Sequence, residues 1–310
     1  MPDGKVERIL VGLELGPRAS RVTQGSQCAA EEAIWLARRV GAAIVFLHST
    51  FGDEVFAPLT AHAAIVSLGA TPEGREALEA VVQRARAAGV TAELEFSEQR
   101  PEFALTRRVL QGGVDLVVIG KRNEPSEDGR PLGGVANKLL RKCPGPVWVV
   151  PPRPGIDRGP VLAATDLSAV GQDVVRIGAW FARQHEVGLH VVHAYQLPFE
   201  LIHEAARVPG DEHRAHLAEL RRKAEQGVRA QLAGLELPPS VELHVGCTSP
   251  ERGIQAAVEL VRPALLVMGT VSQGGIAGLL TGRTAERLLP RLDCSILGVK
   301  PADFVSPIEA

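Results

Sequence analysis

The amino-acid sequence predicts an α/β protein of two tandem, doubly wound domains, each with a mostly parallel, Rossmann-like sheet of about five strands. Two observations support this prediction: the chain repeats itself, and each half alternates short apolar runs with longer amphipathic stretches. Such alternation is typical of a parallel sheet covered by helices on both faces. A proline-rich segment, "PPRPGIDRGP", separates the halves and places the predicted domains at residues 1–153 and 154–310.

The repeat is clearest in the last third of each half. Without a gap, an offset of 149 residues places Gly120 over Gly269 and Gly133 over Gly282. Nearer the start of each half the offset is 145, where "WLAR" aligns with "WFAR" and "VFLHS" aligns with "HVVHA". Loops of different length account for the change in offset. The two halves are therefore predicted to share one fold.

The order of the elements is clearest in the second half. "VLAATDL" predicts a first strand, "QDVVRIGAWFARQH" a helix and "LHVVHAY" a second strand. A charged insertion, "GDEHRAHLAELRRKAEQGVRAQL", predicts a solvent-facing helix. After it come the strand "VELHVG", the helix "SPERGIQAAVELV", the strand "ALLVMG", a glycine-rich loop, a helix beginning near Arg283, and the strand "SILGVK". When the first strand of the other half, "RILVGLEL", is aligned with "VLAATDL", Glu14 corresponds to Asp166.

The composition argues against several classes of protein. With 34 basic residues, 36 acidic residues and 4% aromatic residues, the chain has neither a basic stripe nor stacking platforms, which disfavours nucleic-acid binding. No apolar run is long enough for a membrane span, and the first residues show no secretory signal, so a cytoplasmic protein is expected. The four cysteines form no CxxC pair and are predicted to be small core residues: Cys28, Cys143, Cys247 and Cys294.

A ligand site is predicted at the carboxyl ends of the strands, where the winding of an open parallel sheet reverses. Asp166 follows the first strand of the second half and Gly269 ends the fourth, so both face one crevice if those strands are neighbours. The loop after Gly269 offers backbone N–H groups, and Gly282 lets the backbone approach a phosphate closely. This loop matches neither the P-loop nor the GxGxxG motif, so a purely structural crossover explains the loop equally well.

Three motifs, "ATDLS", "VVHA" and "VMGT", end the first, second and fourth strands of the second half. Together with the tandem repeat, they resemble the universal stress protein family in its two-domain form, over nearly the whole chain. The resemblance implies an adenine nucleotide alpha hydrolase-like fold and an ATP motif of glycine, two residues, glycine, nine residues, glycine, then serine or threonine. Gly269 and Gly282 match the first and third glycines, Ser272 stands at the second, and Arg283 occupies the serine or threonine position, one residue before Thr284.

The resemblance implies that the second domain binds ATP or AMP. Asp166 would then meet the adenine or ribose, Ala194 would line the adenine pocket, and the loop after Gly269 would hold the phosphates. The Cβ of Ser272 disfavours a positive φ by about 1 kcal/mol, whereas the charged donors of Arg283 can replace the missing hydroxyl. The full set of implied ligand residues is Ala164, Thr165, Asp166, Ala194, Met268, Gly269, Ser272, Gly282, Arg283 and Thr284.

The first half departs further from the motif. Asn123 stands at the second glycine position, and three carboxylates follow it in the loop: Glu124, Glu127 and Asp128. Like charges there oppose phosphate binding, and Glu14, in place of the aspartate, would push an extra methylene into the adenine site. We therefore expect the first domain to bind no ATP and to keep its fold in order to pair with the second.

Histidines offer a second candidate chemistry. His190 and His193 are three residues apart on a strand, so they point to opposite faces and do not chelate one ion together. His193 repeats His48, which predicts a shared structural role. A weaker candidate is a zinc site in the charged insertion, built from His213, His216, and Glu212 or His203. No HExxH or CxxC frame supports that site.

The residues and the resemblance allow two main functions. In the first, a stress-response protein binds an adenine nucleotide in its second domain, and occupancy changes its association with partners. Because no catalytic triad can be placed in the crevice and Ser168 is expected to cap a helix, at most weak ATP hydrolysis is expected. In the second, both crevices are degenerate and the chain is an interaction scaffold. The family's dimerisation through the last strand implies an intrachain pseudo-dimer, with a homodimer of whole chains also open.

Overall fold

The computed structural model describes residues 5–16, 20–51, 71–121, 133–153, 158–196, 210–270, 283–288 and 291–309. Contacts along the chain divide it into two compact units. Of the described residues, the first unit contains 5–153 together with those from Asp303 onward, and the second contains those from 158 to 302. The C-terminal segment joins the first unit in part through the side chain of Arg107, whose Nε donates to the carbonyl oxygen of Glu309 (3.1 Å).

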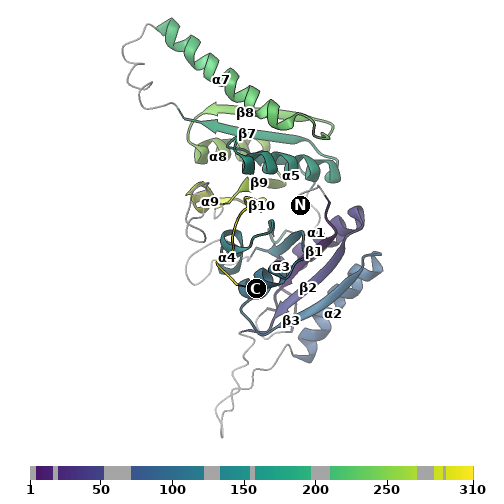
Figure 1. Ribbon diagram of the computed structural model, residues 1–310. Coiled ribbons are helices and arrows are strands. Elements are labelled where there is room, and N and C mark those ends of the chain that lie inside the picture. The colour runs from purple at the N-terminus through teal and green to yellow at the C-terminus, as the bar shows by residue number, and fades with distance from the viewer. Residues whose placement is uncertain are drawn as a thin grey trace. The chain divides into compact units, whose positions relative to one another are not determined.

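The first unit is a parallel sheet with helices on its faces (Figure 1). Its described strands are β1 (Arg8–Leu13), β2 (Ala43–Ser49), β3 (Ala92–Ser97), β4 (Leu116–Gly120) and β5 (Val147–Val150). Its described helices are α1 (Gln24–Val40), α2 (Pro72–Ala87), α3 (Pro101–Leu110) and α4 (Gly134–Lys142). The strand order is β3-β2-β1-β4-β5, and every neighbouring pair is parallel.

The second unit repeats this arrangement. Its described strands are β6 (Val161–Ala164), β7 (Leu189–Tyr195), β8 (Val241–Cys247), β9 (Leu265–Gly269) and β10 (Ser295–Val299). Its described helices are α5 (Ala169–His185), α7 (Gly210–Leu232), α8 (Pro250–Val261) and α9 (Arg283–Leu288). The order β8-β7-β6-β9-β10 is again parallel throughout. The predicted pair of doubly wound domains is therefore confirmed.

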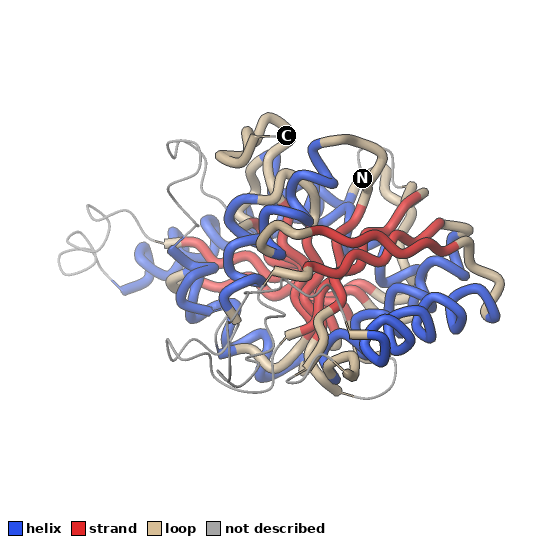
Figure 2. The backbone as a smooth tube through the Cα atoms, turned by 90° about the horizontal axis from the view of Figure 1, so that it is seen from below, coloured by secondary structure: helices blue, strands red, loops and turns tan. Residues whose placement is uncertain are grey.

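Local sequence explains where these elements form. The central strands are nearly continuous apolar runs, such as "LVVIG" in β4 and "LLVMG" in β9, because helices cover both faces of a parallel sheet (Figure 2). Hydroxyl side chains cap the helices that follow the first strands: Thr23 accepts from the N–H of Ser26 in α1, and Ser168 accepts from the N–H of Gly171 in α5. Gly41 ends α1 with a φ of 75°.

The cysteines are predicted to be small core residues, and this prediction holds for three of the four. Cys28, Cys143 and Cys294 are buried, as predicted for small core residues, whereas Cys247 is exposed at the end of β8, so the prediction was wrong for that thiol. A strand-end position on the outermost strand of the unit explains its exposure. Among the described residues, no helix is both long and apolar enough to cross a membrane.

Candidate functional site

The carboxyl ends of β6 and β9 lie side by side in the second unit. Ala164 at the end of β6 is paired with Met268 of β9, and on its other side with Val192 of β7. The chain winds from β6 outward to β8 and then returns to the opposite side of β6 as β9. The winding therefore reverses between β6 and β9, which is where open parallel sheets bind ligands. The expected neighbours are confirmed, and Asp166 and Gly269 follow at this edge.

A tight turn joins β6 to α5, which is why the first strand ends at Ala164 rather than continuing through "TDL". The N–H of Leu167 donates to Thr165 Oγ1 (3.0 Å), and the N–H of Ser168 donates to Asp166 Oδ1 (3.0 Å). The Ser168 hydroxyl also donates to Asp166 Oδ1. Leu167 adopts a φ of 63°, a left-handed conformation. The turn leaves the Asp166 side chain exposed at the edge of the sheet.

Helix α7 holds this turn from the side through Gln231, a residue to which no sequence motif points. The hydroxyl of Thr165 donates to Gln231 Oε1 (2.7 Å), and Gln231 Nε2 donates to the carbonyl oxygen of Ser168 (3.2 Å). Leu167 packs against α7 where Gly227 leaves room, since a Cβ on that glycine would lie 2.7 Å from Leu167 Cδ1. Thr165, one of the implied ligand residues, is thus buried and uses its hydroxyl within the protein.

The remaining implied strand-end residues lie on β9 and β7. Met268 is buried in β9, and Gly269 lies against Val170 of α5, whose Cγ1 would be 3.3 Å from a Cβ on the glycine. Ala194 near the end of β7 contacts α8, where a Cβ on Gly253 would lie 2.7 Å from the Ala194 methyl. These contacts place the implied adenine and ribose residues at the ends of three adjacent strands.

The residues implied in phosphate binding are only partly described. Ser272, Gly282 and the side chain of Arg283 lie outside the described residues. Helix α9 begins at Arg283, as predicted, and Thr284 is half-buried in its first turn. An ion pair between Arg287 Nη1 and Glu251 Oε1 (2.9 Å) ties α9 to α8.

The equivalent place in the first unit is built differently. After β1 the chain forms a short hairpin, in which Leu15 and Val22 make an antiparallel bridge and both side chains are buried. The N–H of Thr23 donates to the carbonyl oxygen of Glu14 (2.8 Å), and the N–H of Glu14 donates to Ser26 Oγ (2.9 Å). The tight turn that exposes an aspartate in the second unit is thus replaced by an apolar hairpin. The acidic loop residues Glu124, Glu127 and Asp128 lie outside the described residues.

The two repeated histidines have the same structural role. His193 Nδ1 is 2.9 Å from the carbonyl oxygen of Thr165, and His48 Nδ1 is 2.9 Å from the carbonyl oxygen of Leu13. Both side chains are buried. In each unit the second strand therefore holds the end of the first strand through a histidine, which confirms the predicted shared role.

A second group of histidines was not found from the sequence. His190 of β7 lies beside Glu242 and His244 of β8, and the three side chains present ligand atoms within 4.8 Å of one another. Burial lowers the pKa of His244 below its ordinary value, and His190 lowers it further, while Glu242 acts in the opposite direction. The signal was the alternation "VELH" on one strand opposite "LHVVH" on its neighbour. Of the histidines in the charged insertion, His216 is exposed on α7, whereas the side chains of His203, Glu212 and His213 lie outside the described residues.

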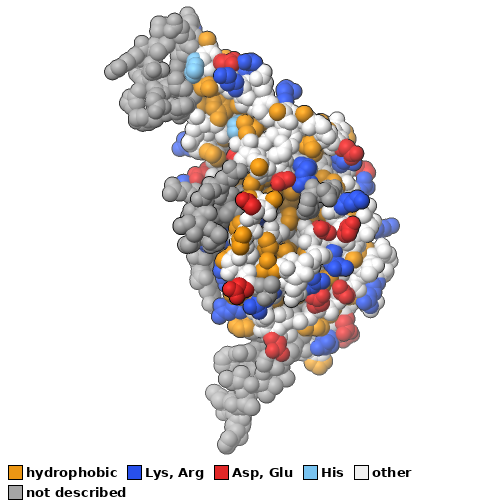
Figure 3. Space-filling model, viewed as in Figure 1, with side chains coloured by type: hydrophobic (Ala, Val, Ile, Leu, Met, Phe, Trp, Pro, Cys, Tyr) orange, Lys and Arg blue, Asp and Glu red, His pale blue; other side chains and the backbone are white. Residues whose placement is uncertain are grey.

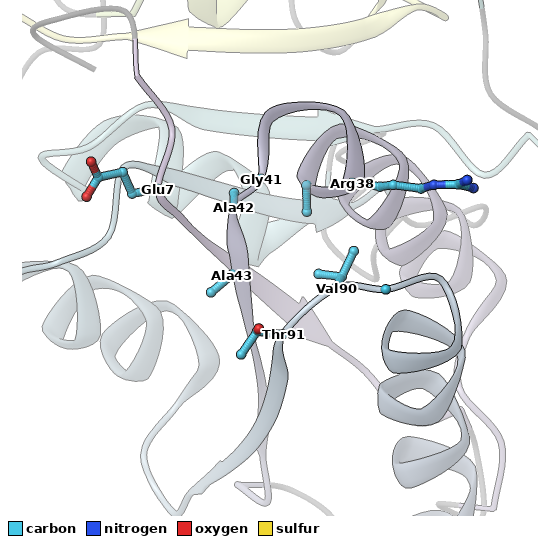
Figure 4. Close-up of a pocket in the computed structure, with 9 residues that line it drawn as sticks. Glu7, Arg38, Gly41, Ala42, Ala43, Val90 and Thr91 are labelled. Atoms are coloured by element: carbon cyan, nitrogen blue, oxygen red, sulfur yellow. The ribbon is translucent and has the colours of Figure 1, made fainter.

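A pocket among the described residues of the first unit shows no converging charged groups. A pocket of about 250 Å³ lies at the amino ends of β1 and β2, beside Ala42 and Val90. Figure 4 shows Glu7 and Arg38 at its rim pointing away from each other, so its charged groups do not converge on a ligand. On the face shown in Figure 3, the basic and acidic side chains of the described residues intermingle.

Comparison with known proteins identifies the fold family. The sequence profile of the universal stress protein family matches residues 6–151 and again residues 158–300. The chain belongs to the universal stress protein family. Universal stress protein E of Escherichia coli strain K12 is 26% identical over 288 residues, which cover 86% of this chain and 90% of that protein. The two units are therefore tandem universal stress protein domains.

Solved structures share this fold over nearly the whole chain. A universal stress protein from Archaeoglobus fulgidus superposes with a TM-score of 0.63 at 18% identity, covering 94% of this chain and 98% of that chain. A Pseudomonas aeruginosa protein described as functionally unknown gives a TM-score of 0.68 at 18% identity, covering 97% and 95%. At this level of identity the likeness establishes the fold of the tandem universal stress protein and leaves its ligand to its own residues.

Proposed function

We propose that the second domain of this universal stress protein binds an adenine nucleotide, ATP or AMP, and that occupancy changes the association of the protein with its partners. The observation that carries the proposal is the exposed carboxylate of Asp166, fixed by Ser168 at the point where the sheet winding reverses. A carboxylate held in this way can accept charge-assisted hydrogen bonds from ribose hydroxyls or an adenine amino group.

The neighbouring strand ends suit the same ligand. Gly269 and Ala194 carry little or no side chain, which leaves space above β9 and β7 for a base and a sugar. Gly269 also stands at the first position of the ATP motif, thirteen residues before Gly282. The first domain has the apolar hairpin of Leu15 and Val22 at the corresponding strand end, so we infer that it binds no nucleotide.

We infer a binding protein rather than an enzyme, with at most weak hydrolysis of ATP. Asp166, the acidic side chain on the turn after β6, has its Oδ1 bonded to both the N–H and the hydroxyl of Ser168. These two hydrogen bonds tie Oδ1 to the turn, so that oxygen is not directed at a water as a general base. We further propose that the two domains of the chain form an intrachain pseudo-dimer, with cytoplasmic partners that recognise the nucleotide-bound form.

The test is nucleotide release followed by a thermal-shift comparison. Purified protein is denatured and the supernatant is analysed for ATP and AMP by chromatography; the unfolding temperature is then measured with and without ATP. At a hundred times its dissociation constant, ATP adds about 2.7 kcal/mol to the free energy of unfolding. Asp166→Asn keeps the oxygen that accepts from Ser168 but removes the charge, so its ATP-dependent shift should be much smaller.

Two further variants complete this test. Gly282→Asp places a negative charge in the ATP motif and should abolish the shift. Glu14→Gln is the matched control in the first domain and should leave the shift unchanged. Absence of both bound nucleotide and any shift in the wild-type protein would refute nucleotide binding and favour the scaffold function. A shift that survives both Asp166→Asn and Gly282→Asp would place the nucleotide elsewhere.

A further inference from the structure

Two histidines and a glutamate converge on one face of the second sheet, on adjacent parallel strands. His190 of β7 is directly opposite Glu242 of β8, and Val192 is opposite His244, so the register puts all three polar side chains on the same face. His190 Nδ1 lies 2.9 Å from His244 Nε2, and 3.7 Å from Glu242 Oε2. The two imidazole rings are nearly parallel, with an interplanar angle of 17°.

This cluster is separate from the proposed nucleotide site. Helix α5 covers the opposite face of the sheet, where Gly178 packs against Leu189. Helix α8 shares the face of the cluster but contacts β7 at its carboxyl end, where Gly253 meets Ala194. β8 is the outermost strand of the unit (Figure 1), so the cluster lies at an accessible edge.

We propose that His190, Glu242 and His244 form a binding site for a divalent transition-metal cation of the zinc type. Zinc is commonly held by imidazole nitrogens and carboxylate oxygens in tetrahedral geometry, with ligand atoms about 3.3 Å apart for bonds near 2.0 Å. The separations of 2.9 and 3.7 Å lie on either side of that value, so small side-chain rotations convert the present contacts into a coordination shell. Three protein ligands leave one position for water or for a small ligand.

The exposure of the His190 and Glu242 side chains matches such a site. The His190 side chain is 16% exposed, which shields the nitrogen ligands, whereas Glu242 is 66% exposed and leaves an entry path from solvent. One hydrogen lies between the two facing ring nitrogens in the absence of metal, since a 2.9 Å contact between neutral imidazoles requires one donor and one acceptor. When the cation binds, that hydrogen moves to the other nitrogen of the same ring, so both facing lone pairs become ligands.

The charge also favours a cation. Two neutral imidazoles and one carboxylate supply a single negative charge, which would reduce the net charge of a bound divalent ion to plus one. This site shares no residue with the zinc site predicted in the charged insertion. Of the residues predicted there, His216 has a described side chain, and it is exposed on α7.

The test uses the full-length, chelator-treated protein without nucleotide, so that its outcome is independent of the proposed function. Zinc binding is measured by titration calorimetry, and cobalt(II) is added as a spectroscopic probe, because tetrahedral cobalt absorbs visible light strongly. We expect one zinc per chain and a tetrahedral cobalt spectrum. His244→Gln and Glu242→Gln should each weaken zinc binding by at least the roughly 10- to 100-fold that loss of a supporting residue costs at other metal sites.

Two control variants distinguish this site from zinc binding by other exposed side chains. His216→Gln removes an exposed histidine from α7, and Glu259→Gln removes an exposed carboxylate from α8; both should bind zinc like the wild type. Because Glu242 is exposed, Glu242→Gln tests the site even if His244→Gln fails to fold. The proposal is overturned if the wild type binds no zinc at micromolar concentration, if Glu242→Gln binds as tightly as the wild type, or if His216→Gln abolishes binding.

Discussion

Asp166 is tied to the turn through one carboxylate oxygen, and the other faces no donor of the described chain at the edge where we propose that the nucleotide binds. Oδ1 is bonded to Ser168, whereas Oδ2 accepts no hydrogen bond from the described part of the chain. The position of the side chain is therefore fixed before a ligand arrives, and a donor on the ligand does not have to compete for the second oxygen. Such preorganisation lowers the entropic cost of binding.

The buried amide of Gln231 provides the first test of how the turn is held. Gln231→Ala removes the acceptor of the buried Thr165 hydroxyl and a donor to the carbonyl oxygen of Ser168. A buried polar group left without its partner costs about 1–3 kcal/mol, so the free energy of unfolding should fall by that amount. Urea unfolding followed by circular dichroism measures the change. Gln255→Ala, on the exposed face of α8, is the control and should be nearly neutral; equal losses in the two variants would mean that the turn does not depend on α7.

Some residues of the site were predictable and others were not, for a physical reason. Ser168 as a helix cap and His193 as a strand-end histidine follow from short-range patterns, because capping and repeat alignment depend on residues close in the sequence or equivalent in the twin domain. Gln231 contacts Thr165 from 66 residues away, and the left-handed φ of Leu167 depends on the space left by Gly227. Such contacts exist only once the elements are packed.

The first helix and fourth strand approach each other differently in the two domains. In the first domain the contact is backbone to backbone, since a Cβ on Gly120 would lie 2.1 Å from the carbonyl carbon of Gly25. In the second domain the side chain of Val170 lies between α5 and Gly269. The glycine that the repeat preserves at the end of the fourth strand thus serves helix packing in both domains, and only in the second does it also border the proposed nucleotide.

These two glycines should tolerate alanine unequally. Gly120→Ala forces the backbone of α1 away from β4, and overpacking of this kind costs about 1–3 kcal/mol in the free energy of unfolding. Among the described residues, a Cβ on Gly269 would meet Val170 Cγ1 at 3.3 Å, which a small side-chain movement relieves, so the loss for Gly269→Ala should be distinctly smaller. Urea unfolding measures both. Gly134→Ala, where a Cβ would meet no atom of the described residues within 4 Å, should not lower stability. A larger loss for Gly269→Ala than for Gly120→Ala would contradict this account.

The sequence predicts helix α7 correctly but predicts only part of its packing. The charged insertion predicts a solvent-facing helix, and the described side chains in its first half are exposed or half-buried, with Glu219 paired to Arg222. The hydrogen bond from Arg222 lowers the pKa of Glu219. In its second half, however, Ala224, Val228 and Leu232 are buried against the sheet. Charge dominates the composition of the segment and conceals this short apolar stripe, which is what brings Gln231 to the turn.

The whole chain carries two copies of one fold that differ at the ligand edge. The fold could be predicted because parallel strands and their helices leave a periodic, repeated signature along the sequence, and the twin domain doubles that signal. The site could be predicted only in part, because loops at the strand ends have no such periodicity. An apolar hairpin after β1 and a tight turn after β6 arise from a difference of a few residues in loop length. In the sequence, the first domain differs from the second most visibly in its acidic loop, and the difference in the length of the loop after the first strand is less apparent.

These two features of the first domain make different predictions for nucleotide stoichiometry. If the hairpin containing Leu15 and Val22 excludes the nucleotide, neutralising the acidic loop will not restore binding. We therefore expect equilibrium dialysis with labelled ATP to saturate at one nucleotide per chain, both for the wild type and for the triple variant Glu124→Gln, Glu127→Gln, Asp128→Asn. High salt should not raise the value either, although it screens repulsion between exposed charges. A stoichiometry of two in the triple variant would show that charge, rather than the hairpin, keeps nucleotide out of the first domain.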